Sequence, residues 1–285
     1  MSSQPEHILT LSCPDATGIV YHVSGFLFER GCNIIDSAQF GDESTGLFFM
    51  RVHFSAPEPL DGRTLKTQFD IVASRFAMQA QFHEMRAKPR VLLMVSKFGH
   101  CLNDLLFRWS SGQLPMEIPA IVSNHTDFQP LAHSYRIPFL YLPVSAQNKA
   151  EQEARLTDLV ERERIDLVVL ARYMQILSPQ LCEQLHGRVI NIHHSFLPSF
   201  KGAKPYAQAH DRGVKLIGAT AHYVTADLDE GPIIEQDVER VDHAMTPDEL
   251  AAVGHDVESV VLARALKWHI EHRVLINGHR TVVFR

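Results

Sequence analysis

The chain has 285 residues, 45% of them hydrophobic and 21% charged, a composition typical of a soluble globular protein long enough for two domains. The net charge of −6 predicts no broad basic face, so we expect neither a nucleic-acid partner nor binding to an anionic membrane surface. No run of about eighteen apolar residues occurs, which argues against a membrane-spanning helix.

The cysteines and the first residues indicate the compartment. Cys13, Cys32, Cys101 and Cys182 lack the paired spacing of a metal site or a redox pair. We interpret them as small buried side chains in a reducing environment. The chain does not open with a basic stretch followed by an apolar run, so we expect no secretory signal and a cytoplasmic location.

Residues 1–86 predict one compact domain. The expected elements are a strand over 7–13, a helix from Ile19 to a stop at Gly31, strands over 32–40 and 47–55, a helix over 65–76 and a strand over 79–85. The order βαββαβ indicates a ferredoxin-like antiparallel sheet with helices on one face. Thr17 is the expected N-cap of the first helix.

The polar, proline-closed stretch 86–89 is a plausible boundary, and residues 87–285 predict a second domain in which strands alternate with helices. The expected strands cover 90–95, 120–123, 139–142, 167–171, 189–192 and 217–223, and the clearest helices cover 147–163 and 247–272. This alternation predicts an α/β fold: a Rossmann-like, mostly parallel sheet with helices on both faces.

The segment 189–202 is an apolar strand that ends in polar residues and a proline-containing loop. Asn191 and His193 are two residues apart, so their side chains point to the same side of an extended strand. In an open α/β sheet, ligands bind beyond the carboxyl ends of the strands. An amide that donates to an oxyanion and an imidazole that moves protons suit acyl chemistry at this place.

A second polar segment covers 219–233, where a strand ends near Tyr223 and a loop carries Asp227 and Asp229. A loop carboxylate beside the histidine would stabilise the protonated ring and orient an attacking water. Asp227 is most simply a solvated turn residue.

These motifs carry a family resemblance. Asn191-Ile192-His193 and 197–202, followed by 228–232, resemble the signature of the folate-dependent formyltransferase superfamily over about residues 90–285. The resemblance implies a catalytic trio of Asn191, His193 and Asp229, with folate as the substrate, no cofactor and no metal. A metal site built from His193, His194, His222 and Asp229 is conceivable from residue types alone, but it does not fit this chemistry.

The same resemblance implies two folate-binding segments, Met174, Gln175, Ile176 and Leu177 in one and Val224, Thr225, Ala226 and Asp227 in the other. Gln175 stands where relatives often place arginine, so we expect no charge-based folate contact at this position. Further candidates for the pocket are His222, Lys201, Lys204, Tyr206, Gly99 and His100. The lysines would meet the glutamate tail of the folate, and Tyr206 would line the entrance.

Segment 96–103 departs from the ribonucleotide formyltransferases, which carry a glycine- and serine-rich phosphate loop there. Phe98 and His100 should crowd a phosphate seated on backbone amides, which favours water as the nucleophile.

The N-terminal domain resembles an ACT domain through segments 13–20 and 31–34. This resemblance implies an amino-acid effector such as glycine or methionine, with Asp15, Thr17, Gly18 and Asn33 as candidate contacts. The alternative is an oligomerising module that binds nothing. In either case an exposed sheet edge favours a homo-oligomer.

An ACT-like domain before a formyltransferase-like domain is similar to enzymes that hydrolyse 10-formyltetrahydrofolate to formate and tetrahydrofolate. Such enzymes balance one-carbon pools and supply formate for purine synthesis. Two alternatives stay open: a formyltransferase that passes the formyl group to an amine acceptor, and a noncatalytic folate or amino-acid sensor. A sensor would have no need to keep Asn191, His193 and Asp229 together.

Overall fold

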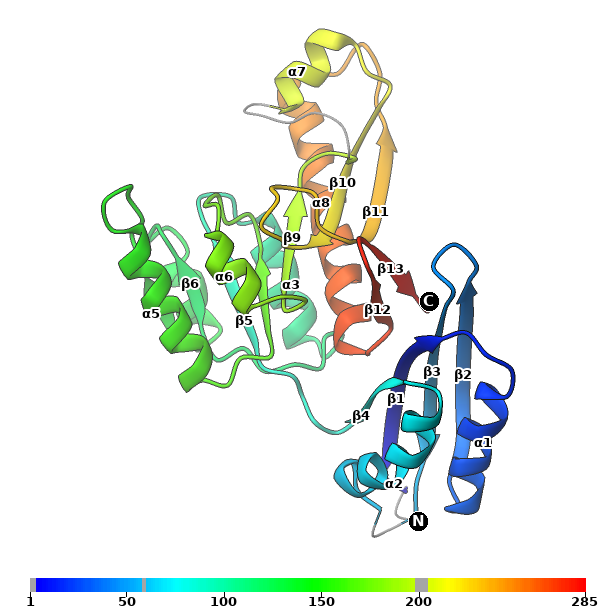
Figure 1. The fold of residues 1–285 in the computed structure, drawn as a ribbon. Coiled ribbons are helices and arrows are strands. Elements are labelled where there is room, and N and C mark those ends of the chain that lie inside the picture. Colours follow the sequence, from blue (N-terminus) through cyan, green and yellow to red (C-terminus); the bar gives the residue numbers. More distant parts are fainter. Residues whose placement is uncertain (1–3, 58–59, 198–204) are drawn as a thin grey trace. The chain divides into compact units, whose positions relative to one another are not determined.

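The computed structural model describes residues 4–57, 60–197 and 205–285 (Figure 1). Its contacts divide the chain into two compact units. Unit 1 comprises Met1–Lys88 with Glu271–Asn277 and Val282–Arg285, and unit 2 comprises Pro89–Ile270 with Gly278–Thr281. The sequence assigns everything after residue 86 to one domain, whereas the last residues of the chain group mainly with unit 1.

Unit 1 contains the predicted βαββαβ order. Its elements are β1 (Glu6–Pro14), α1 (Ile19–Glu29), β2 (Asn33–Asp42), β3 (Leu47–Ser55), α2 (Gly62–Arg75) and β4 (Gln79–Glu84). The strands pair antiparallel in the order β2-β3-β1-β4, which confirms the ferredoxin-like sheet. Alternate residues of β1, such as Leu9 and Leu11, pack with Phe26 of α1 and Phe69 of α2 in one buried core.

The ends of α1 are set by glycines. Gly18, at φ 96°, is the N-cap, and its carbonyl accepts from the backbone N–H of His22 at 3.0 Å. The prediction that Thr17 caps this helix is therefore wrong, because no side chain caps it. Gly31, at φ 68°, follows the C-terminal turn, and the N–H of Cys32 bonds back to the carbonyl of Leu27 at 3.0 Å.

Unit 2 contains the predicted α/β sheet. Its elements are β5 (Val91–Val95), α3 (His100–Ser110), β6 (Ile121–Ser123), α4 (Gln129–Ser134), β7 (Phe139–Tyr141), α5 (Lys149–Arg162), β8 (Leu167–Leu170), α6 (Pro179–Gln184), β9 (Val189–His193), α7 (Pro205–Arg212), β10 (Leu216–Tyr223), β11 (Ile233–Arg240) and α8 (Pro247–Ile270). The order is β11-β10-β9-β8-β5-β6-β7. Strands β5 to β9 are parallel, which confirms a mostly parallel sheet.

Four strands differ from the expectation. The run 217–223 was expected in the parallel sheet, but β10 pairs antiparallel with both β9 and β11. Strand β11 was not predicted, and neither was the C-terminal hairpin of β12 (Val274–Asn277) and β13 (Arg280–Val283).

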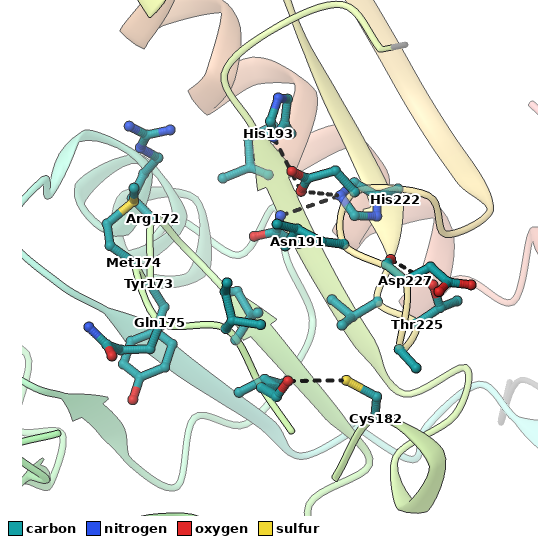
Figure 2. A pocket seen from close by; sticks show the side chains of 18 of the residues that line it. Arg172, Tyr173, Met174, Gln175, Cys182, Asn191, His193, His222, Thr225 and Asp227 are labelled. Atoms are coloured by element: carbon teal, nitrogen blue, oxygen red, sulfur yellow. Dashed lines mark hydrogen bonds and ion pairs between the residues drawn. The ribbon is translucent and has the colours of Figure 1, made fainter. Parts of the chain in front are cut away.

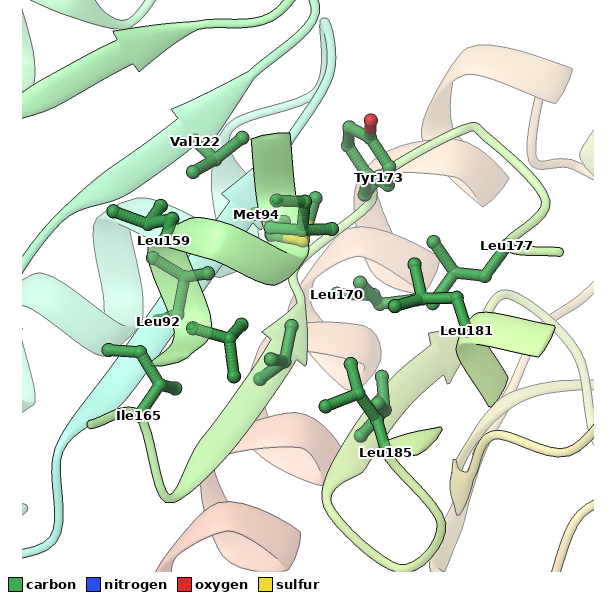
Figure 3. Close-up of a cluster of buried hydrophobic side chains, with 14 of the residues drawn as sticks. Leu92, Met94, Val122, Leu159, Ile165, Leu170, Tyr173, Leu177, Leu181 and Leu185 are labelled. Carbon is green, nitrogen blue, oxygen red and sulfur yellow. The ribbon is translucent and has the colours of Figure 1, made fainter. Parts of the chain in front are cut away.

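The core of unit 2 explains why its central strands are apolar throughout. Every residue of β5, β6 and β8 is buried, as expected for strands covered on both faces (Figure 1). Figure 3 shows Leu92 of β5 and Leu170 of β8 in a cluster with Leu159 of α5 and Leu181 of α6. Helix α8 instead packs against β9, β10 and β11.

All four cysteines carry free thiols, and Cys13, Cys101 and Cys182 are buried. Among the helices that the structure describes, none combines the length and apolar character needed to cross a bilayer.

Candidate active site

A cavity of about 230 Å³ opens at the carboxyl ends of β8 and β9, beneath the loop that follows β10 (Figure 2). Its lining residues are Leu170, Arg172–Leu177, Cys182, Asn191–His194, His222 and Val224–Asp229. The strand order of the sheet reverses beside this edge, between β5 and β8. The cavity therefore lies where open α/β sheets bind their ligands.

Asn191, His193 and Asp229 meet at this cavity. Asn191 is half-buried on β9, while His193 at the end of the strand is 7% exposed. Asp229 comes from the loop after β10, and its Oδ1 lies 3.3 Å from Nδ1 of His193. Two segments that are more than thirty residues apart thus form one cluster, as the sequence predicted.

The backbone around Asp229 is tightly constrained. Asp229 itself has φ 59°, in the left-handed region that non-glycine residues rarely adopt. Two residues later, a Cβ on Gly231 would lie 1.7 Å from the carbonyl oxygen of Tyr223, so only glycine fits. The Tyr223 N–H in turn bonds to the carbonyl of Pro232 at 2.9 Å. This close return of the chain holds the carboxylate beside His193.

The contact between His193 and Asp229 fixes one proton. The hydrogen bond from His193 holds the pKa of the Asp229 carboxyl below its ordinary value, so the group is a carboxylate at neutral pH. Nδ1 of the imidazole must then carry the hydrogen that it donates. In the neutral ring Nε2 is left with a lone pair, and this buried atom has no hydrogen-bond partner within the described part of the chain.

His222 orients the amide of Asn191. The two residues face each other across the β9–β10 pair, and Nε2 of His222 lies 3.3 Å from Nδ2 of Asn191 (Figure 2). The other ring nitrogen lies 2.8 Å from the carbonyl oxygen of Tyr223, to which it donates. Burial lowers the pKa of His222, so the ring stays neutral and its Nε2 accepts from the amide. One N–H of Asn191 is left for another acceptor.

The two predicted folate-binding segments both line the cavity. Ser96 anchors the first, since its N–H donates to the carbonyl of Arg172 at 3.1 Å and its hydroxyl accepts from the N–H of Met174 at 2.9 Å. The second begins where the N–H of Val224 bonds to the carbonyl of Val189 at 2.9 Å. Met174 and Ile176 are more than half exposed, and they offer apolar surface to a flat ligand.

Other predicted residues lie elsewhere. His100 and Tyr206 do not line this cavity but bond to Glu258, and Gly99 packs against Phe128. Lys201 and Lys204 lie outside the described residues. The candidate effector contacts Asp15, Thr17, Gly18 and Asn33 belong to unit 1.

Sequence reasoning missed a buried carboxylate. Glu258 of α8 has no exposed surface, and its oxygens accept from the hydroxyl of Tyr206 at 2.6 Å and from Nε2 of His100 at 2.7 Å. Nε of Arg172 lies 3.3 Å from the same carboxylate. No local sequence pattern predicts these contacts, because the bonded residues are 52 to 158 positions apart along the chain.

An amide, an imidazole and a carboxylate around one cavity at a parallel-sheet edge define a site suited to acyl transfer or hydrolysis. Known proteins agree with this class. The family model described as "Formyl transferase" matches residues 89–266. A formyltetrahydrofolate deformylase of Corynebacterium sp. (strain P-1) is 52% identical, with all of both chains covered.

Solved structures extend the comparison. A formyltetrahydrofolate deformylase from Burkholderia mallei is 56% identical, with a TM-score of 0.95 over 99% of this chain and all of the other. A glycinamide ribonucleotide transformylase from Symbiobacterium toebii is 27% identical, with a TM-score of 0.66 over 71% of this chain and 97% of the other. The chain therefore belongs to the formyl transferase family and, within it, to the formyltetrahydrofolate deformylase family.

Proposed function

We propose that this chain hydrolyses 10-formyltetrahydrofolate to formate and tetrahydrofolate. The observation that carries the proposal is the convergence of Asn191, His193 and Asp229 on one cavity. The full-length relatives named formyltetrahydrofolate deformylase support the same reaction. Its role would be to balance one-carbon pools and to supply formate for purine synthesis.

In the first step, water adds to the formyl carbon. His193 takes the proton from the water through Nε2, while the Asp229 carboxylate holds the ring by its Nδ1 and stabilises the imidazolium that forms. The new C–O bond converts the formyl oxygen into an oxyanion. The N–H of Asn191 that His222 does not use stabilises this charge.

In the second step, the tetrahedral adduct collapses. The bond between the formyl carbon and N10 breaks, and protonated His193 returns its proton to N10. The products are tetrahydrofolate and formic acid, which releases its proton to the solvent and leaves as formate. No amine and no redox partner is needed to balance the reaction, and the histidine ends in its starting state.

The pterin ring would lie between the two cavity segments. Met174–Leu177 and Val224–Asp227 offer backbone groups to its polar edge and apolar side chains to its faces. Gln175 is uncharged, so its contact would be a hydrogen bond and not an ion pair. We assign Lys201 and Lys204 to the anionic glutamate tail.

We infer that water, and not a phosphate-bearing amine, accepts the formyl group. Side chains occupy the start of α3, where the phosphate of such an amine would bind. His100 is the first residue of this helix, and its ring is bonded to the buried Glu258. Phe128 packs so closely on Gly99 that an added Cβ would lie 2.2 Å from its ring. A phosphate that sought the backbone amides there would have to displace these side chains.

For unit 1 we propose an ACT-type regulatory role in a cytoplasmic homo-oligomer. Edge strand β2 exposes Ile34, Ile35 and Phe40, which favours pairing with another subunit. Glycine or methionine would bind near Asp15 and Asn33. A change in hydrolysis rate on titrating either amino acid supports this role, and an unchanged rate with a monomer in light scattering contradicts it.

Formate release without an amine acceptor tests the proposed reaction. We expect one formate per 10-formyltetrahydrofolate consumed, and the same rate when glycinamide ribonucleotide is added. Strict dependence on the ribonucleotide, with a formylated amine as product, would instead establish a transferase. Substrate binding with no turnover under either condition would indicate a sensor.

A further inference from the structure

A buried ion-pair cluster lies behind the catalytic trio. Its centre is Glu258, with no exposed surface, and its cation is Arg172, which is 7% exposed. Burial raises the pKa of Glu258, but the hydrogen bond from His100 and the charge of Arg172 outweigh it and hold the pKa below its ordinary value. The carboxylate is thus charged, and Arg172 is its buried counter-ion.

His100, His255 and Glu258 also present potential metal-ligand atoms within 4.8 Å of one another. The two imidazoles stack nearly parallel at 4.1 Å, so their in-plane lone pairs do not converge well on one ion. Arg172 already contacts the same oxygen of Glu258 that His100 does. We therefore interpret the cluster as an ion pair whose carboxylate also accepts hydrogen bonds from His100 and Tyr206, and not as a cation site.

Arg172 connects this cluster to the catalytic histidine. Its NH1 lies 3.3 Å from Nδ1 of His194, and the ring of His194 stacks on that of His193 with centroids 4.5 Å apart. Arg172 has φ 65°, so a strained backbone places this guanidinium at the end of β8. Glu258, Arg172, His194 and His193 form a continuous row of contacts.

The contact with Arg172 decides the proton position on His194. A guanidinium has only donors, so Nδ1 of His194 must accept and cannot carry a hydrogen. The neutral His194 ring therefore holds its hydrogen on Nε2. His193 shows the reverse arrangement, because its Nδ1 donates to Asp229. Two stacked imidazoles are thus held in opposite tautomers.

We propose that Arg172, held in place by its buried counter-ion Glu258, is a positioning residue for hydrolysis, which locks His194 as a neutral ring against His193. His193 is then the only one of the two adjacent imidazoles that takes up a proton during the reaction. The catalytic consequence rests on the proposed function, whereas the tautomers can be measured without substrate.

The groups around His194 agree with this assignment. His193 from β9 and Arg172 from the loop after β8 oppose a positive charge on the ring, while Glu258 of α8 and Asp229 favour one. The ring of Tyr206 from α7 approaches it to 6.5 Å but adds no charge. Burial, with the charges of His193 and Arg172, lowers the pKa of His194 to about 4.

Ring ¹⁵N NMR of the substrate-free protein tests the proposal. In the wild type we expect the Nε2–H tautomer for His194 and a hydrogen on Nδ1 of His193 between pH 6 and 8. Arg172→Met removes both the donor and the positive charge, so His194 should lose its fixed tautomer and titrate at higher pH. Glu258→Gln removes the negative charge and should shift the titration of His194 to lower pH.

Controls separate these shifts from misfolding. If either single variant unfolds, the double variant Glu258→Gln, Arg172→Met replaces it, because removing both charges leaves no buried charge without a counter-ion. Arg188→Met deletes a different guanidinium of unit 2, one that bonds to backbone carbonyls, and should leave both tautomers unchanged. If the two substitutions only disturbed the packing, Arg172→Met and Glu258→Gln would not shift the titration of His194 in opposite directions.

Activity supplies the second readout. In Arg172→Met, protonated His194 would oppose charge on His193, so we expect kcat to fall about ten-fold more at pH 6 than at pH 8. A wild-type His194 with hydrogen on Nδ1, or one that titrates near its ordinary pKa, would overturn the proposal. If the tautomers are as expected but no formate is released, the proposed function fails and the assigned tautomers stand.

Discussion

His193→Ala should lower kcat for formate release by about 10³-fold or more, the largest loss that we expect from any single substitution. Among the residues that the structure describes, His193 is the group placed to take the proton from water and return it to N10. Its ring is 7% exposed and held by Asp229 at 3.3 Å, so no solvent base can replace it in the same position. Formate should be measured under saturating substrate, where kcat reports the chemical steps.

The matched control is His133→Ala, on the exposed face of α4 and away from the cavity. It should leave kcat unchanged. Binding of the folate by His193→Ala should also change little, because the pterin contacts come from other segments. A His193→Ala protein that releases formate within ten-fold of the wild-type rate would contradict the assigned base.

Asn191→Ala should lower kcat by about 10²- to 10³-fold with a small change in KM. The amide N–H is directed at charge that develops only in the tetrahedral intermediate, so its loss affects the barrier more than ground-state binding. His222 holds the amide in this orientation from the opposite strand. The measurement is steady-state formate production over a range of substrate concentrations.

The control for this substitution is Asn148→Ala, at the start of α5, which should change neither constant. If Asn191→Ala raised KM and left kcat unchanged, the amide would bind the substrate and the transition state equally and would have no oxyanion role.

The central site could be predicted because its residue types give a local signal and the family resemblance identified Asn191, His193 and Asp229 as one trio. Asn191 and His193 share one strand face, and Asp229 follows the next strand in a loop, so the sheet topology brings them together. The ferredoxin-like and α/β folds could be predicted because their signals are also local. Fully buried β5 and β8 are continuous apolar runs, and the glycine after α1 marks a helix end.

The missed features depend on distant or weak signals. Five of the six residues Glu235–Arg240 of strand β11 are polar, so its sequence does not predict a strand, and it forms one by pairing with β10. The hairpin of β12 and β13 could have been found, since Asn277-Gly278 is a strong turn signal. The contacts of Glu258 with Arg172 and His100 join separate elements, and no spacing rule links them.

Hydrolysis in water enriched with ¹⁸O tests the central claim most directly. If water attacks the formyl carbon at the site of Asn191, His193 and Asp229, the released formate must carry one oxygen atom from the solvent. Mass spectrometry of formate from the wild type should show this label at the rate of substrate loss. His193→Ala should form labelled formate about 10³-fold more slowly, because the general base is lost. Unlabelled formate, or label that appears equally fast without His193, would contradict the account.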